Sequence, residues 1–240
     1  MSELPKSDPP DRARGVFLGD LAHDLSTPLT AIHGATELLL TGAYGPLEGE
    51  QRTLVAEILA SARDLRSYVQ DVADLGALDT GRLVFASTSF NAHAVIDDVQ
   101  TACAATAAGR AVQFSLDAHA PPVLESDERR LRQVLSAVFG YAVKAARRGS
   151  AVTGTVTHRD RVLRVEVRTS GVTPTGDPRA LFVDRRDLTP GVPKQYRGPG
   201  LGLPLIGRVV EAWGGQVGAS VVDGALVLTV DVPAVAVPPA

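Results

Sequence analysis

Apolar residues recur at helical spacing through the first third of the chain. Between about 16 and 40 they stand three, four or seven positions apart, which places them along one stripe of a helix. This stripe contains Phe17, Leu21, Leu25, Pro28, Ile32 and Leu39. A second helix is predicted from about 48 to 78, with a stripe of Leu54, Ile58, Ala62, Leu65, Val69, Val72 and Leu75. The intervening TGAYGP predicts a turn, so the two helices form an antiparallel hairpin.

Each predicted helix carries a wide apolar face, and two helices alone leave part of both faces uncovered. Pairing two such hairpins buries these faces in a shared core. The pattern therefore predicts a homodimer in which two hairpins form a four-helix bundle.

Beyond about residue 80, strands and helices are mixed. Strands are predicted at 83–85, 112–116, 151–157 and 161–168, and helices at 92–105, 128–149 and 203–213. Asn91 caps the first of these helices, and either Ser126 or Asp127 caps the second. The turn HRD joins the last two strands, and Asp223-Gly224 closes a C-terminal hairpin. This order predicts an α/β sandwich with the helices on one face of the sheet.

Composition narrows the class of protein. The net charge of −3 with interspersed signs provides no basic field for nucleic acid, and no apolar run approaches the roughly 18 residues that span a bilayer. We expect a cytoplasmic chain with a flexible, proline-containing leader over 1–14, and leave open whether a sensor or membrane region precedes it. The single Cys103 is predicted to pack in the core, and no metal site is predicted.

His23 lies on the side of the first helix opposite its apolar stripe, where a core histidine is not expected. It is two positions from both Leu21 and Leu25, about 200° round the helix from each, and therefore faces solvent. Asp24 and Thr27 share its exposed side. Pro28 removes a backbone donor, which frees the Asp24 carbonyl and favours a bend. Taken alone, these residues also suit a surface helix with an incidental histidine.

The string HDLSTPL, preceded by FLGDLA and followed by TAIHG, resembles the phosphoacceptor box of sensor histidine kinases, H-[ED]-x-x-[TN]-P. The resemblance implies that His23 carries a phosphoryl group and that Asp24 assists proton transfer. It also implies that Thr27 positions the water that dephosphorylates a response regulator.

The later elements resemble the ATP-binding domain of histidine kinases, gyrases, Hsp90 and related ATPases, and the combined resemblance covers about 15–232. It implies a dimerisation and histidine-phosphotransfer hairpin over 15–80. An ATP-binding-type domain follows over 81–236.

The boxes of this second domain are degenerate. RGPGLGLP resembles the second glycine box, whose glycines are Gly198, Gly200 and Gly202. Lys144 and Gly171 also match family positions. Ala137 and Tyr141 replace two asparagines, Thr169 replaces the aspartate that accepts the adenine amino group, and Thr173 replaces a glycine. Mg²⁺ prefers oxygen ligands that a bulky neutral tyrosine supplies poorly. Loss of one bond to a charged acceptor weakens binding about ten- to a hundredfold.

Three functions remain open. The favoured one is a phosphotransfer protein in which His23 exchanges phosphoryl with a response-regulator receiver, with no cofactor and without ATP as donor. The second is an active ATP-dependent histidine kinase, for which weak ATP or Mg-ATP binding is expected. The third is a silent dimeric scaffold that binds a regulator.

Overall fold

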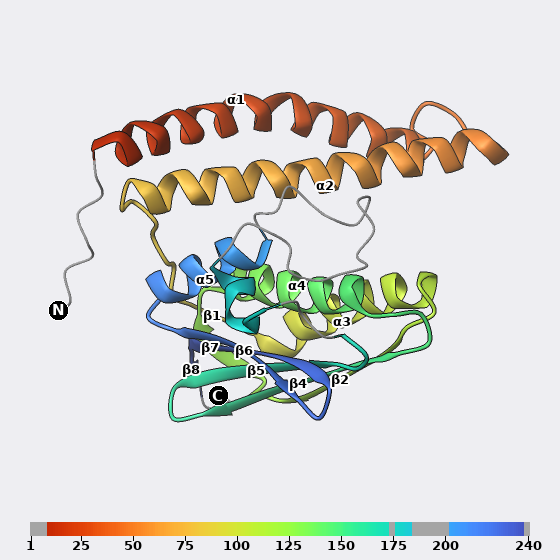
Figure 1. The fold of residues 1–240 in the computed structure, drawn as a ribbon. Helices are drawn as coiled ribbons and strands as arrows, with labels where there is room; N and C mark the ends of the chain where they lie inside the picture. Colours follow the sequence, from red (N-terminus) through yellow and green to blue (C-terminus); the bar gives the residue numbers. More distant parts are fainter. Residues whose placement is uncertain (1–8, 173–175, 184–201, 238–240) are drawn as a thin grey trace. The chain divides into compact units, whose positions relative to one another are not determined.

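The computed structural model describes residues 9–172, 176–183 and 202–237. The chain divides into two units, with the boundary between Leu83 and Val84. The first unit is a helical hairpin and the second is an α/β sandwich (Figure 1). The predicted hairpin and the predicted α/β sandwich are both confirmed, and the dimeric four-helix bundle stays a prediction.

Two long helices, α1 (Pro9–Leu40) and α2 (Gly49–Asp79), form the hairpin. The prediction that 1–14 is a flexible leader is wrong for 9–14, which are helical; residues 1–8 lie outside the described part of the chain. Prolines are tolerated in a first helical turn, where the missing N–H has no partner to lose. Arg14 fixes this extension, because its Nε and Nη2 donate to Oδ2 of the buried Asp79 at 3.1 and 2.8 Å.

Small residues let the two helices approach closely. A Cβ added to Gly15 would lie 2.8 Å from the Gly76 carbonyl oxygen, and one added to Gly76 would lie 2.6 Å from the Gly15 carbonyl oxygen. Ala22, Leu29 and Val69 form a buried cluster farther along the seam. Backbone contact at the base and apolar packing above it therefore hold the hairpin together.

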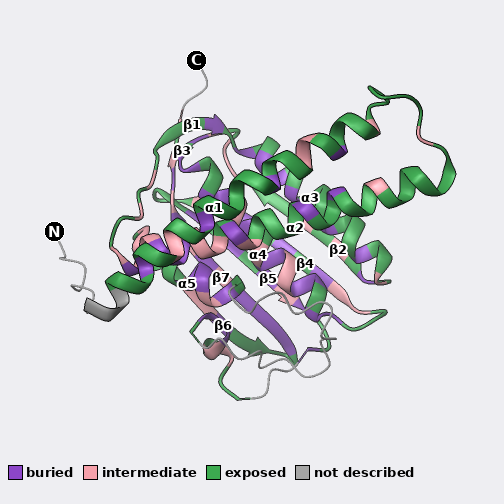
Figure 2. Cartoon of the chain, turned by 90° about the horizontal axis from the view of Figure 1, so that it is seen from above, coloured by how far each residue is buried: buried purple, intermediate pink, exposed green. Residues whose placement is uncertain are grey.

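The predicted apolar stripes only partly coincide with this seam. Their large side chains are exposed in the single chain; they are Phe17, Leu21, Leu25, Ile32 and Leu39 on α1 and Leu54, Ile58 and Leu65 on α2. On each helix, a rotation of about 65–90° round the axis, in the direction in which the chain advances, leads from this exposed row to the buried row. Because the helices are antiparallel, both rows fall on the same side of the hairpin. Much of both helices is accordingly coloured as exposed in Figure 2.

The second unit is built on a five-stranded sheet in the order β2-β4-β5-β7-β6. Its strands are β2 (Gln113–His119), β4 (Ala151–Arg159), β5 (Val162–Thr169), β6 (Gln216–Val222) and β7 (Ala225–Pro233). All neighbours are antiparallel except β2 and β4, which are parallel. A short 3₁₀ helix, η1 (Pro178–Phe182), precedes the last helix.

Three helices cover one face of this sheet (Figure 1), as predicted. They are α3 (Ala92–Gly109), α4 (Glu128–Ala145) and α5 (Gly202–Ala212). Their inward side chains and those of the sheet share one hydrophobic core, which includes Cys103. Burial raises the pKa of the Cys103 thiol to about 11, so this cysteine packs rather than reacts.

A second, three-stranded sheet was not predicted. It consists of β1 (Thr88–Asn91), β3 (Val123–Ser126) and β8 (Val235–Ala236), in the order β1-β3-β8. The predicted strand at 83–85 is wrong, because these residues form no ladder and Phe85 instead stacks on Trp213. Strands this short carry too little alternation to be recognised in a sequence.

Side-chain caps set the helix boundaries. The Asn91 side chain accepts from the Ala94 amide, as predicted, and of the two candidates for α4 it is Asp127 that accepts from the Arg130 amide. The predicted end of α4 near 149 is four residues too late. Arg110 donates to the carbonyls of Val143, Lys144 and Ala146, which satisfies the helix end at Ala145.

Candidate phosphotransfer and nucleotide sites

His23 lies near the middle of α1 with its side chain exposed, as predicted. Asp24 and Thr27 are exposed as well. Within the described part of the chain, none of these three side chains makes a hydrogen bond or an ion pair. The imidazole is therefore accessible to a large partner.

The backbone beneath His23 is firmly held. Ala22 and Leu29, on either side of it in the sequence, are buried against α2. The Ser26 hydroxyl donates to the Ala22 carbonyl at 2.7 Å, and the Thr30 hydroxyl donates to the Ser26 carbonyl at 2.8 Å. The helix continues through Pro28, so the residue that frees the Asp24 carbonyl does not end it. A reactive group on a packed helix keeps its position better than one on a loop.

Asp20 also lies close to His23 on the surface of α1 and was not singled out from the sequence. It precedes His23 by three residues, a spacing that places the two side chains on neighbouring parts of the helix surface, and it is exposed. With Asp24 it gives the histidine a carboxylate on each side. The i, i+3 spacing was the available signal.

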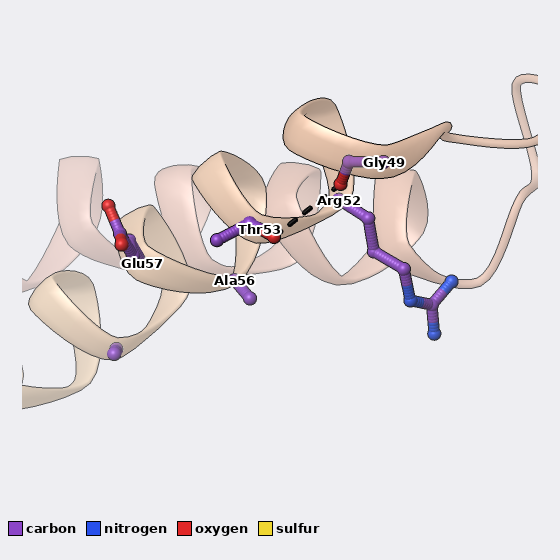
Figure 3. A pocket seen from close by; sticks show the side chains of 6 residues that line it. Gly49, Arg52, Thr53, Ala56 and Glu57 are labelled. Carbon is purple, nitrogen blue, oxygen red and sulfur yellow. Dashed lines mark hydrogen bonds between the residues drawn. The ribbon is translucent and has the colours of Figure 1, made fainter.

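An open depression of about 500 Å³ lies on α2 (Figure 3). It is lined by Gly49, Arg52, Thr53, Ala56, Glu57 and Ala60. Half of these lining residues are glycine or alanine, and the Thr53 hydroxyl donates to the Gly49 carbonyl at 3.5 Å. None of the predicted site residues lines it.

The second group of predicted residues lies on α4 and at the end of β5. Ala137 and Tyr141 are half-buried and pack against the hydrophobic core, whereas Lys144 is exposed in the last turn of α4. Thr169 ends β5, is 0% exposed, and its hydroxyl has no partner among the described residues. Gly171 follows with a φ of 69°, which suits glycine.

The predicted glycine box is described only in part. Gly202 is exposed and begins α5, where backbone amides point out of the helix start. Gly198, Gly200 and Thr173 lie outside the described residues. Of the glycines in this box, Gly202 is therefore the one whose position the structure describes.

Two family models match the chain. Residues 13–81 match the His Kinase A (phospho-acceptor) domain, and residues 126–235 match the histidine kinase-, DNA gyrase B- and HSP90-like ATPase. The chain belongs to the sensor histidine kinase family. The first match contains His23, Asp24 and Thr27, and the second contains the α4, β5 and α5 positions.

Sensor histidine kinases of known sequence extend beyond this chain. The sensory/regulatory protein RpfC of Xanthomonas campestris is 32% identical over 217 residues, which are 87% of this chain and 29% of RpfC. The sensor protein GacS of Pseudomonas syringae is 29% identical over 220 residues, which are 24% of GacS. The chain thus spans less than a third of these relatives.

Solved histidine kinases share the fold. Full-length ShkA in complex with AMPPNP superposes with a TM-score of 0.64 at 25% identity, covering 92% of this chain and 46% of ShkA. ThkA in complex with the response regulator TrrA superposes with a TM-score of 0.55 at 18% identity, covering 93% of this chain and 64% of the solved chain.

In the described part of this chain, no helix is both long enough and apolar enough to cross a membrane.

The described residues fit a magnesium-bound triphosphate poorly. Ala137 and Tyr141 supply neither the carboxamide nor the carboxylate oxygen that Mg²⁺ prefers. At the end of β5 the hydroxyl of Thr169 is neutral and fully buried, so it neither carries the charge of an aspartate nor opens to solvent. Among the described positions, Lys144, Gly171 and Gly202 keep the residue types expected from the family resemblance.

Proposed function

We propose that this chain is a histidine-kinase-like phosphotransfer protein of two-component signalling, with His23 as the phosphoryl carrier. The observation that carries the proposal is the exposed imidazole of His23 on a packed helix, which has no partner among the described residues and lies inside the matched phosphoacceptor domain. Its partner is the receiver aspartate of a response regulator. The transfer can run in either direction.

The chemistry needs few groups. An imidazole nitrogen of His23 attacks the phosphorus of a phosphoaspartate; an N–P bond forms while the P–O bond to the aspartate breaks, and the carboxylate leaves. Asp24 assists proton transfer at the imidazole. Thr27, at i+4 on the same side of the helix, holds the water that removes phosphoryl from the receiver.

ATP is not the donor in this proposal. Ala137 and Tyr141 leave the metal without an amide ligand, and Thr169 leaves the base without a charged acceptor. The second unit then acts as a pseudokinase domain that keeps the fold without the phosphoryl donor chemistry.

A homodimer completes the proposed molecule. The exposed rows on α1 and α2 lie on one side of the hairpin, and a second copy that presents the same face would cover them. His23 lies about 160–200° round α1 from Leu21, Leu25 and their neighbours, so dimerisation leaves it open.

The receiver partner is supported by two findings. The first is the match to a phosphoacceptor domain, and the second is the fold shared with ThkA, which was solved in complex with a response regulator. The exposed small and polar residues around His23 leave room for such a domain.

One observation favours an alternative. Lys144, Gly171 and Gly202 keep family residue types, and ShkA, which shares the fold, was solved with AMPPNP. The alternative function is an ATP-dependent histidine kinase that phosphorylates itself on His23.

The test uses the full chain and a labelled, phosphorylated receiver. We expect label on the wild type and none on His23→Gln. His33→Gln is the matched control, because His33 lies on the same helix and pairs with Glu37 at 3.1 Å. Label that persists in His23→Gln would show that another residue carries the phosphoryl group. Absence of label from every protein would support the silent scaffold instead.

A further inference from the structure

The segment that joins the two units is anchored at both ends. On the hairpin side, Gly81 adopts a φ of 65°, and the Arg82 amide donates to the Ala77 carbonyl at 2.8 Å, which closes the C-terminus of α2. On the other side, Phe85 and Ala86 already bind to the second unit. Leu83 and Val84 lie between these anchors, and the unit boundary falls between them.

Phe85 is held by an aromatic stack. Its ring centroid lies 5.6 Å from that of Trp213, with 4° between the ring planes, which is an offset parallel arrangement. Trp213 directly follows α5, and its amide donates to the Val209 carbonyl at 2.9 Å. The stack therefore ties the linker to the end of a helix whose other end carries Gly202.

Ala86 is held by a buried carboxylate. Its amide donates to Oδ2 of Asp127 at 2.9 Å, while Oδ1 of the same carboxylate accepts from the Arg130 amide at 2.9 Å and caps α4. Asp127 is 5% exposed; its bond with the Arg130 amide is buried, and its bond with the Ala86 amide is partly buried. One side chain thus anchors the linker and begins the helix that carries Tyr141 and Lys144.

We propose that the Phe85–Trp213 stack and the Asp127–Ala86 bond form a linker latch. Closed, the latch limits the tether between the units to Leu83 and Val84. Open, it releases Phe85 and Ala86 as far as Ser87, whose hydroxyl donates to Oε1 of Glu125 at 3.3 Å, and the tether becomes Leu83–Ala86. At roughly 3.3–3.6 Å per extended residue, this adds about 7 Å to the reach of the second unit.

The latch contacts both helices of the nucleotide-type site. A shift of the α4 start moves Asp127, and a shift of the α5 end moves Trp213, so either shift loosens the linker. The segment is therefore a two-state element through which changes in the second unit alter the tether. This inference is independent of the direction of phosphoryl flow.

Trp213 provides the readout, because it is the one tryptophan of the chain. Phe85→Ala should raise acrylamide quenching of its fluorescence about twofold, since the ring that covers the indole is removed. Trypsin cleavage after Arg82 should rise about fivefold as the segment opens locally. Phe85→Tyr keeps the ring and Val84→Ala changes an exposed neighbour, so both should match the wild type.

A second variant separates tether length from folding. Two glycines inserted between Val84 and Phe85 lengthen the tether and keep the stack, so cleavage after Arg82 should rise while Trp213 quenching stays unchanged. Far-UV circular dichroism checks that every variant is folded. Wild-type quenching and cleavage in folded Phe85→Ala would overturn the latch, as would equal changes in Val84→Ala.

Discussion

At the scale of residues, the clearest separation of roles concerns His23 and Thr27. In the proposed function the histidine supplies the nucleophile, whereas the threonine hydroxyl holds the water that attacks the receiver. Neither side chain is tied up by another described residue, so each can be changed without breaking a network.

Thr27→Ala should therefore slow receiver dephosphorylation about a hundredfold, the cost of a misplaced reactant, and leave transfer between the receiver and His23 near the wild-type rate. Label released as inorganic phosphate measures dephosphorylation, and label that appears on this chain measures transfer to His23. Thr30→Ala is the control, because this exposed threonine on the same helix donates to the Ser26 carbonyl. Equal loss of both activities in Thr27→Ala would contradict the separate roles.

The nucleotide positions lead to a second residue-scale prediction. Tyr141→Asn with Thr169→Asp should raise the affinity for Mg-ATP at least about tenfold, because it restores a metal-ligating amide and a charged acceptor worth roughly 1.5–3 kcal/mol. Calorimetry with and without Mg²⁺ measures the change. Thr169→Val, which keeps shape and removes the hydroxyl, should leave the affinity unchanged. A wild type that already binds Mg-ATP tightly would contradict the account.

The exposure of His23 could be predicted from the sequence, whereas the pairing of distant side chains could not. The 3.6-residue period alone placed His23 on the solvent side. By contrast, Arg14 and Asp79 are 65 residues apart in the sequence, and nothing local indicates that they meet. The burial of Thr169 likewise depends on packing between elements that are distant in the sequence, such as α4 and β5.

At the scale of elements, the hairpin depends on the contact of Gly15 with Gly76. Gly15→Ala should destabilise the chain by about 1–3 kcal/mol, the usual cost of forcing a methyl group into a packed contact. Gly19→Ala is the matched control, since a Cβ there meets nothing within 4 Å, and it should stabilise the helix by about 0.5–1 kcal/mol. Chemical unfolding followed by circular dichroism measures both. Equal stabilities of the two variants would contradict the close contact.

Element boundaries show where local patterns stop being informative. Both long helices and the Asp223-Gly224 turn were predictable, and Asp223 and Gly224 indeed have φ angles of 50° and 72°. The start of α1 was missed because three prolines and alternating charges without periodicity indicated a flexible leader, although Pro9 and Pro10 suit a first helical turn. The parallel pairing of β2 with β4 was also missed, since it joins segments separated by α4.

At the scale of the whole molecule, the exposed apolar face of the hairpin predicts a dimer. Leu21→Glu combined with Ile58→Glu should give a folded monomer, because charges on this face oppose its burial. Val16→Glu changes an exposed apolar residue on another side of α1 and should stay dimeric. Light scattering after size-exclusion chromatography decides between them. A monomeric wild type would contradict the prediction.

The central claim is that His23 receives phosphoryl from a receiver and not from ATP. Phosphorus NMR of the full chain tests it directly, because a phosphohistidine has a resonance distinct from those of ATP and phosphoaspartate. The account predicts this resonance after addition of a phosphorylated receiver, no such resonance after Mg-ATP alone, and none from either donor in His23→Gln. A phosphohistidine resonance that grows from Mg-ATP alone and is lost in His23→Gln would contradict the account and identify an active kinase.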